Sequence, residues 1–297
     1  MEIRKDFSEP ADFGVPAGCL PDAFVGLRRP FWINSRQPVF RACRGLGTRR
    51  LFIVALVLFA ISGWRGAASS GKAAAAENDD ALHIHMIAGA KEYDAVKSCQ
   101  AWKQRLEADP GVTVTASWTT DRGRQLEDLD QLPEADLLVV FARRLQLDES
   151  TMATVRSHWR SAKPVIGIRT ASHAFSRDEN ETFDKKVLGN HYTGHYGNQP
   201  CRVTNNPELA KHPILQGVKP FESRKLYKAG ELPETTQVLQ FAVMKNAREP
   251  VTLTHRYNGA KIFYTSLGTP EDFRDPNFQR LLDNAVSWAT GRELRGH

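Results

Sequence analysis

The sequence predicts an α/β domain in which helices cover both faces of a parallel sheet. Three observations support this fold class. Strand-like and helix-like segments alternate from residue 82 to residue 168. Residues 135–141 form a short continuous apolar run, which is typical of a central strand buried on both faces. The last segment, residues 277–290, places apolar residues at helical spacing on one face.

Each element of the alternating part has its own local signal. The segment 82–88 alternates with a period of two and is closed by Gly89, which predicts a strand. The first predicted helix stops at Asp109-Pro110-Gly111, and Asp148 caps the second one. Further strands are predicted at 112–118, 135–141 and 163–168, and the helices at 92–108 and 148–161.

The regular pattern breaks after residue 168. Residues 173–201 are polar and rich in Gly, Asn and His, and we expect them to form a long functional loop without regular structure. Three more strands are predicted at 238–243, 251–255 and 261–266. Asn258-Gly259 is a hairpin-turn signal between the last two strands, and Gly291 ends the final helix.

The N-terminal quarter carries the whole excess of positive charge. Residues 1–76 hold 11 Lys and Arg against 5 Asp and Glu, whereas residues 77–297 hold 29 of each. A neutral domain has no overall attraction for a phosphate backbone, so no nucleic-acid partner is expected. Of the four cysteines, Cys99 and Cys201 lie in the neutral part, and the sequence leaves their pairing open.

The charge excess accompanies an export signal. Residues 51–64 form a 14-residue apolar run behind Arg44, Arg49 and Arg50. This length fits a secretory h-region, and 74–76 offers a cleavage site. The alternative is an uncleaved anchor that attaches the chain to the membrane. We therefore predict three parts: a disordered basic extension (1–50), a signal peptide or anchor (51–76), and an exported domain (77–297).

Candidate ligand-binding residues follow the predicted strands, because ligands of open α/β sheets bind outside the carboxyl ends of the strands. Those ends carry residues 89–92, 119–122, 143–144 and 167–175. The last of them sits where a nucleophile elbow would lie, although no G-x-S-x-G pattern is present. Arg169 is expected to clamp a hydroxyl, carbonyl or carboxylate. For Thr170 and Ser172, the alternative to ligand binding is that they cap a helix.

A second candidate is the His-Tyr segment formed by His191, Tyr192, His195 and Tyr196. Tyrosine faces suit sugar rings, and histidine suits general acid–base work. The two histidines have the i, i+4 spacing of a zinc-binding helix, but glycines interrupt the segment and no H-E-x-x-H motif is present. No metal and no cofactor are therefore expected. His83 and His85 lie on one strand face, and one or both are predicted to be hydrogen-bonded structural residues.

Several ordered segments resemble the ThuA-like (trehalose utilisation) family of the class I glutamine amidotransferase-like superfamily. They are VIGIRTASHAF (165–175), LGNHYTGH (188–195), HPILQG (212–217), LY (226–227) and PVTLTHRYNGAKIFYTSLG (250–268), followed by the closing pattern of 278–289. The resemblance implies a flavodoxin-like sheet with amidotransferase-like topology and a role near carbohydrate metabolism. Arg169-Thr170 stands where amidotransferases carry the nucleophilic Cys, which implies that glutaminase chemistry is absent.

Other departures concern acid–base groups. Many relatives carry His at the position of Arg169 and Gly-His where this chain has Gly268-Thr269. His195 matches the His retained in the family loop. The sequence therefore predicts an exported protein that acts on a small sugar-derived ligand.

Each candidate residue has a predicted role at that site. His195 would be the acid or base, with His191 and His173 in support, and Arg169, Thr170, Tyr192 and Tyr196 would bind the ligand. The alternatives are a non-catalytic carbohydrate-binding or scaffold domain, and a metal-dependent hydrolase that uses His173, His191 and His195.

Overall fold

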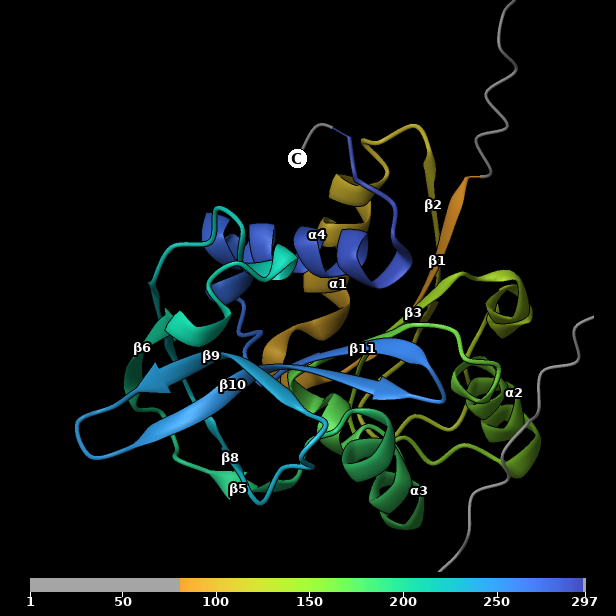
Figure 1. Cartoon of the computed structure of the whole chain (residues 1–297). Coiled ribbons are helices and arrows are strands. Elements are labelled where there is room, and N and C mark those ends of the chain that lie inside the picture. The colour runs from red at the N-terminus through yellow and green to blue at the C-terminus, as the bar shows by residue number, and fades with distance from the viewer. Residues whose placement is uncertain (1–80, 296–297) are drawn as a thin grey trace, which may run out of the picture. The chain divides into compact units, whose positions relative to one another are not determined.

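A computed structural model describes residues 81–295 of the chain (Figure 1). The predictions for the basic extension, the apolar run 51–64 and the cleavage site lie outside the described residues and stay predictions. Among the helices of residues 81–295, none has the length and apolar character needed to cross a membrane.

The central element is a nine-stranded sheet with strand order β2-β1-β3-β4-β11-β10-β9-β6-β7. The first five strands in this order are mutually parallel, and the remaining four pair antiparallel. The parallel strands are β1 (Leu82–Gly89), β2 (Val112–Trp118), β3 (Leu137–Ala142), β4 (Val165–Ile168) and β11 (Ala260–Thr265). The antiparallel strands are β6 (Pro200–Asn205), β7 (Phe221–Arg224), β9 (Gln237–Val243) and β10 (Arg248–Tyr257). A separate two-stranded ribbon pairs β5 (Tyr192–His195) with β8 (Tyr227–Ala229).

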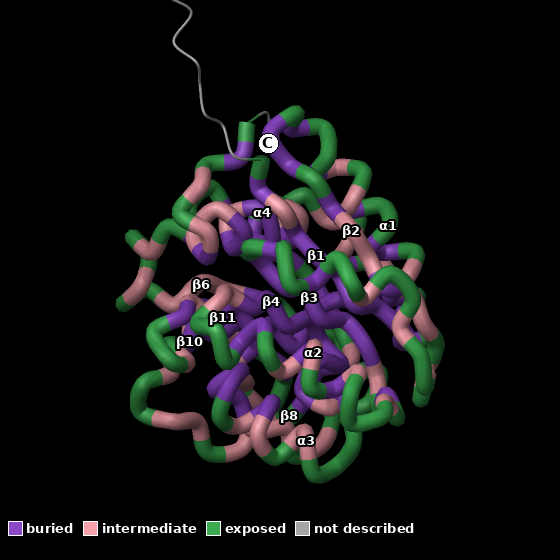
Figure 2. The backbone as a smooth tube through the Cα atoms, turned by 90° about the vertical axis from the view of Figure 1, so that its right-hand side faces the viewer, coloured by how far each residue is buried: buried purple, intermediate pink, exposed green. Residues whose placement is uncertain are grey.

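Helices cover both faces of this sheet, which confirms the α/β prediction. In Figure 1, α1 (Ala95–Leu106) and α4 (Pro276–Thr290) lie on one face, and α2 (Glu149–Arg160) and α3 (Arg177–Thr182) on the other. Two separate clusters of buried apolar side chains follow this division, one against α1 and α4 and the other against α2. Figure 2 shows the buried strands between these two layers of helices.

The predicted helix ends are confirmed. The carboxylate of Asp148 accepts a hydrogen bond from Thr151 N at 2.7 Å and so caps α2. Gly291 ends α4 in the left-handed conformation, with φ of 76°. Asn258 and Gly259 both have positive φ, as a type I′ hairpin turn requires, and they join β10 to β11. The predicted hairpin is therefore confirmed, and with it the antiparallel part of the sheet begins beside the five parallel strands.

Two expectations about the connections are wrong. Only a 3₁₀ helix, Leu129–Glu134, lies between β2 and β3, where the alternating pattern implied an α-helix. Residues 173–201 are not a structureless loop. They form α3, a π-helical turn at Phe183–Val187, strand β5 and the start of β6. Their polar composition concealed this structure because these short elements lie near the surface and show little apolar periodicity.

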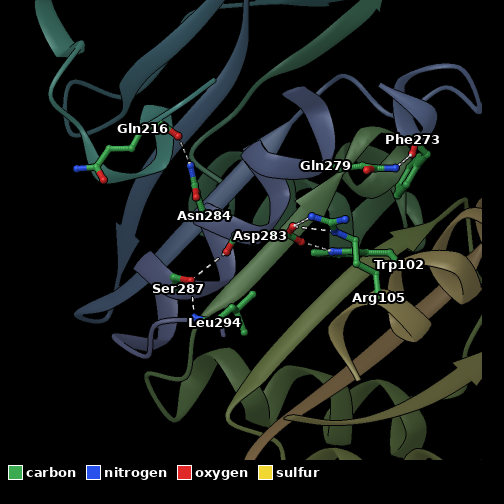
Figure 3. A network of polar contacts seen from close by, with 9 residues as sticks. All are labelled: Trp102, Arg105, Gln216, Phe273, Gln279, Asp283, Asn284, Ser287 and Leu294. Carbon is green, nitrogen blue, oxygen red and sulfur yellow. Dashed lines mark hydrogen bonds and ion pairs between the residues drawn. The ribbon is translucent and has the colours of Figure 1, made fainter. Parts of the chain in front are cut away.

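Buried polar contacts hold the elements together. Asp283 of α4 accepts hydrogen bonds from Trp102 Nε1 at 3.1 Å and from Arg105 Nε at 2.9 Å, which ties α4 to α1 (Figure 3). His83 Nε2 lies 2.8 Å from Thr115 Oγ1, and His85 Nδ1 lies 2.8 Å from the same oxygen. The prediction that these histidines are hydrogen-bonded structural residues is confirmed. Cys99 and Cys201 are both buried free thiols, which closes the open question of their pairing.

Candidate functional site

The chain turns sharply where β4 ends. Arg169 has a φ of 47°, which is uncommon for a residue with a side chain, and a 3₁₀ helix spans Arg169–His173. The carboxyl ends of β1, β3 and β4 meet at this same edge because these strands are parallel neighbours. The turn that follows β4 therefore lies, as the sequence predicted, at the edge of the sheet where α/β proteins bind ligands.

Arg169 is fully buried, and its guanidinium contacts protein groups. Nη1 donates to Ser266 O at 2.8 Å, and Nη2 donates to Lys225 O at 2.6 Å. The guanidinium carbon lies 3.9 Å from the ring centre of Tyr93 and 4.8 Å from that of Tyr227. Arg169 thus joins the segments that follow β4, β11 and β7 behind the surface of the site.

Thr170 and Ser172 do not cap the helix that they enter. The 3₁₀ helix begins without a side-chain cap, and Ser176 caps α3 instead. Thr170 is fully buried, and its Oγ1 has no hydrogen-bond partner among the described residues. Ser172 Oγ donates to Arg169 O at 3.3 Å and lies 3.0 Å from His173 Nδ1. The capping alternative is therefore wrong for both residues.

A pocket of about 240 Å³, which we call the central pocket, opens at this edge. It is smaller than the pockets that take drug-sized ligands. Residues of three strand ends and of the β5–β8 ribbon line it: Glu92, Tyr93, Arg143, Arg144, His173, Tyr192, His195, Gly197, Asn198, Lys225 and Tyr227. Aromatic walls with a few charged groups suit a small polar ligand.

Aromatic rings pack against His173 in this pocket. Its ring centre lies 4.7 Å from that of Tyr192 and 5.6 Å from that of Tyr227. Burial lowers the pKa of His173 to about 3, and the positive charges of Arg143 and Arg144 act in the same direction. His173 is therefore neutral at pH 7, and its ring forms part of the wall of the pocket.

The β5–β8 ribbon carries the other predicted histidines. His195 is exposed, pairs with Tyr227 across the ribbon, and its Nδ1 accepts a hydrogen bond from Gly197 N at 3.3 Å. It lines the central pocket, as His173 does. His191 lines a different pocket, described next. The structure thus brings His173 and His195 to one cavity and places His191 in the neighbouring one.

The second cavity, about 760 Å³, adjoins the central pocket through the shared residues Arg144, His173 and Tyr192. We call it the arginine pocket. Its remaining lining residues are Arg122, Arg124, Gln146, Ser172, Phe175, Arg177, Asn180, Glu181, Asp184, Lys185 and His191. Asp184 is buried, and burial raises the pKa of its carboxyl to about 6. Its two oxygens accept from Asn190 Nδ2 at 2.7 Å and from Tyr192 N at 2.8 Å.

Three predicted residues line neither pocket. Arg169 and Thr170 are buried behind the elbow, and the hydroxyl of Tyr196 donates to the carboxylate of Glu249. This hydrogen bond raises the pKa of Tyr196 to about 12. Among residues 81–295, no three His, Cys, Asp or Glu side chains are grouped so that they could hold a metal ion.

The pocket residues Tyr93, Lys225 and Tyr227 were not predicted from the sequence. Tyr93 fitted the helical apolar pattern, which is equally typical of a core residue. Tyr227 reaches the pocket through the pairing of β8 with β5, and Lys225 precedes β8, where its backbone N donates to Gln199 O at 3.3 Å. The strand-end rule, by contrast, did indicate Glu92, Arg143 and Arg144.

Gly189, which precedes the His-Tyr segment, is expected to tolerate no side chain. Its φ is 63°, and a Cβ atom there would lie 2.4 Å from His255 Cγ and 2.6 Å from Thr236 Oγ1. We expect Gly189→Ala to lower the free energy of unfolding by about 3 kcal/mol, measured by urea denaturation. In the control Gly259→Ala, φ is 86° and nothing lies within 4 Å, so only the backbone penalty of about 1 kcal/mol should remain. Equal losses in the two variants would contradict the steric argument.

Comparisons with known proteins agree with this architecture. The family model described as "ThuA: Trehalose utilisation" matches residues 82–289. A search of curated proteins finds no significant match. A crystal structure of a ThuA-like protein from Bacteroides uniformis is 15% identical with a TM-score of 0.57, covering 79% of this chain and 98% of that one. A ThuA-like protein from Parabacteroides merdae is 16% identical with a TM-score of 0.53, covering 73% and 92%.

A third similar structure is larger. The β-galactosidase from Bacillus circulans sp. alkalophilus is 9% identical with a TM-score of 0.50, and the match covers 72% of this chain but only 32% of that enzyme. At such identities these structures show the fold alone. The family match spans most of the chain, from the first residue of β1 into the last turn of α4. The chain therefore belongs to the ThuA (trehalose utilisation) family.

Proposed function

We propose that this protein binds a small sugar-derived ligand in the central pocket and acts on it outside the cytoplasm. The observation that carries the proposal is the cluster of Tyr192, Tyr227 and His173 rings at the carboxyl edge of the sheet, beside Glu92 and Arg144. Rings offer flat apolar faces, and the charged groups offer hydrogen bonds to hydroxyls. Membership of the ThuA family supports a carbohydrate-related role.

His195 is the proposed acid or base of this reaction. It lies at the exposed rim of the central pocket, whereas burial holds His173 in its neutral form. The other groups would bind and orient the ligand, with Tyr192 and Tyr227 as stacking surfaces. Neither glutaminase chemistry nor an elbow nucleophile is part of the proposal, because Arg169 occupies that position and is buried.

The test is turnover and binding of a panel of neutral, oxidised and phosphorylated sugars by the full chain. We expect His195→Ala to lower turnover about 100-fold while the affinity changes little. We expect Tyr192→Ala to weaken binding about tenfold, because a stacking face is lost. His212→Ala is the control, since His212 packs on Trp288 and lines neither pocket. Full turnover in His195→Ala would contradict the assignment, and fractionation of expressing cells tests the exported location.

A non-catalytic carbohydrate-binding protein is the second candidate. The buried Arg169 and the neutral His173 favour it, because both remove reactive groups from the edge of the sheet. Binding that depends on Tyr192, without turnover of any sugar in the panel, would support this candidate over the first.

A further inference from the structure

The arginine pocket holds positive charge that the protein itself does not neutralise. Among residues 81–295, the side chains of Arg122, Arg124, Arg144 and Arg177 make no ion pair and no hydrogen bond. The two carboxylates that line the pocket are already engaged. Glu181 pairs with Lys185 at 2.6 Å, and both oxygens of Asp184 accept hydrogen bonds. Several like charges around one cavity repel each other unless an anion joins them.

Two of these arginines have an uncommon backbone conformation. Arg122 and Arg144 have positive φ, 58° and 52°, among eight such non-glycine residues in the described part of the chain. Arg144 N donates to His173 O at 2.8 Å, and Arg122 N donates to Arg143 O at 3.0 Å. Such backbone strain persists only where its surroundings fix it, and it concentrates at ligand clamps.

We propose that the arginine pocket binds the anionic group, a phosphate or a carboxylate, of the ligand whose sugar ring occupies the central pocket. The identification of the ring rests on the function proposed above, whereas the anion site rests on the arginines alone. Guanidinium forks match oxyanions with two parallel hydrogen bonds. Arg144, His173 and Tyr192 line both pockets, so the two cavities are neighbours, and the acidic substituent of a ring in the central pocket would lie towards the arginine pocket. The substrate class is therefore an acidic sugar derivative.

The experiment measures binding to the full chain by calorimetry, using inorganic phosphate, a neutral hexose, its 6-phosphate and the corresponding uronate. We expect at least one of the two acidic sugars to bind roughly tenfold more tightly than the neutral hexose, and 0.5 M salt to weaken that binding. The two acidic sugars distinguish a phosphate from a carboxylate as the bound group.

Arg122→Gln and Arg177→Gln test the site directly, because both residues line only the arginine pocket and are exposed. Each variant is expected to weaken the binding of the acidic sugar and of inorganic phosphate roughly tenfold, and to leave the affinity for the neutral hexose unchanged. Arg256→Gln is the control, because it makes the same charge change on the exposed β10–β11 hairpin.

The outcomes separate the two proposals. The anion site would be overturned if acidic and neutral sugars bound with equal affinity. It would also be overturned if Arg256→Gln weakened the binding of the acidic sugar as much as the pocket variants do. Phosphate binding that depends on Arg122 and Arg177, with no sugar binding at all, would support the anion site and contradict the proposed function of the central pocket.

Discussion

Lowering the pH from 8 to 5 is expected to cost the folded domain a large part of its stability. Burial lowers the pKa of His85 to about 4, of His158 to about 4 and of His173 to about 3, against an ordinary value of 6.5. Below pH 6.5 the unfolded chain therefore binds three protons that the folded domain does not. The free energy of unfolding falls as the pH falls towards the folded pKa values, by about 2 kcal/mol per histidine at pH 5.

Asp184 acts in the opposite direction. Its pKa is raised to about 6 in the folded domain, so protonation between pH 6 and the ordinary value of 3.8 favours folding. This offsets about 1 kcal/mol of the loss at pH 5. The net expected decrease is about 5 kcal/mol, which is large against the 5–15 kcal/mol typical of a domain.

Urea denaturation between pH 8 and pH 5, followed by tryptophan fluorescence, measures this dependence. The matched variant is His158→Gln, which keeps an amide donor for the 2.9 Å contact with Pro164 O but cannot titrate. We expect its pH dependence to be weaker by about the contribution of one histidine, 2 kcal/mol at pH 5. An unfolding free energy that stays constant from pH 8 to pH 5 would contradict the argument.

The sequence predicted those elements whose signals are local. The period of two in β1 and β2, the cap at Asp148 and the turn at Asn258-Gly259 each depend on a few neighbouring residues. The ribbon of β5 and β8 depends on pairing across more than 30 residues, and β5 includes glycine and polar residues with no strong strand preference. Sequence patterns do not register such pairing, which is why the segment was expected to be a loop.

The same limit applies to the candidate site. The strand-end rule located the edge of the sheet with Arg169 and His173, and the composition of the His-Tyr segment indicated His195. It could not predict the direction of the Arg169 side chain, because that depends on a left-handed backbone and on Lys225, 56 residues away. Nor could it separate His191 from His195, which lie at opposite ends of the β5 segment and line different pockets.

We therefore expect replacement of Arg169 to lower the stability of the domain more directly than it lowers ligand affinity. We expect Arg169→Met to lower the free energy of unfolding by about 3 kcal/mol, measured by urea denaturation. The change leaves the carbonyls of Ser266 and Lys225 without their donors and removes the cation from the rings of Tyr93 and Tyr227. Methionine keeps a long side chain and the same backbone strain, so the difference reports on the guanidinium alone.

Arg256→Met is the control, because Arg256 is exposed on the hairpin and donates to Gly259 O at 3.1 Å. It should stay within about 0.5 kcal/mol of the unchanged protein. Sugar binding then decides between the two roles considered for Arg169. If Arg169 is a ligand clamp, Arg169→Met would weaken sugar binding and leave the free energy of unfolding unchanged. If Arg169 is a framework residue, Arg169→Met would lower the stability of the domain, and any loss of sugar affinity would come from displacement of Tyr227. The double variant Arg169→Met/Tyr227→Ala would then bind sugar no more weakly than Tyr227→Ala alone.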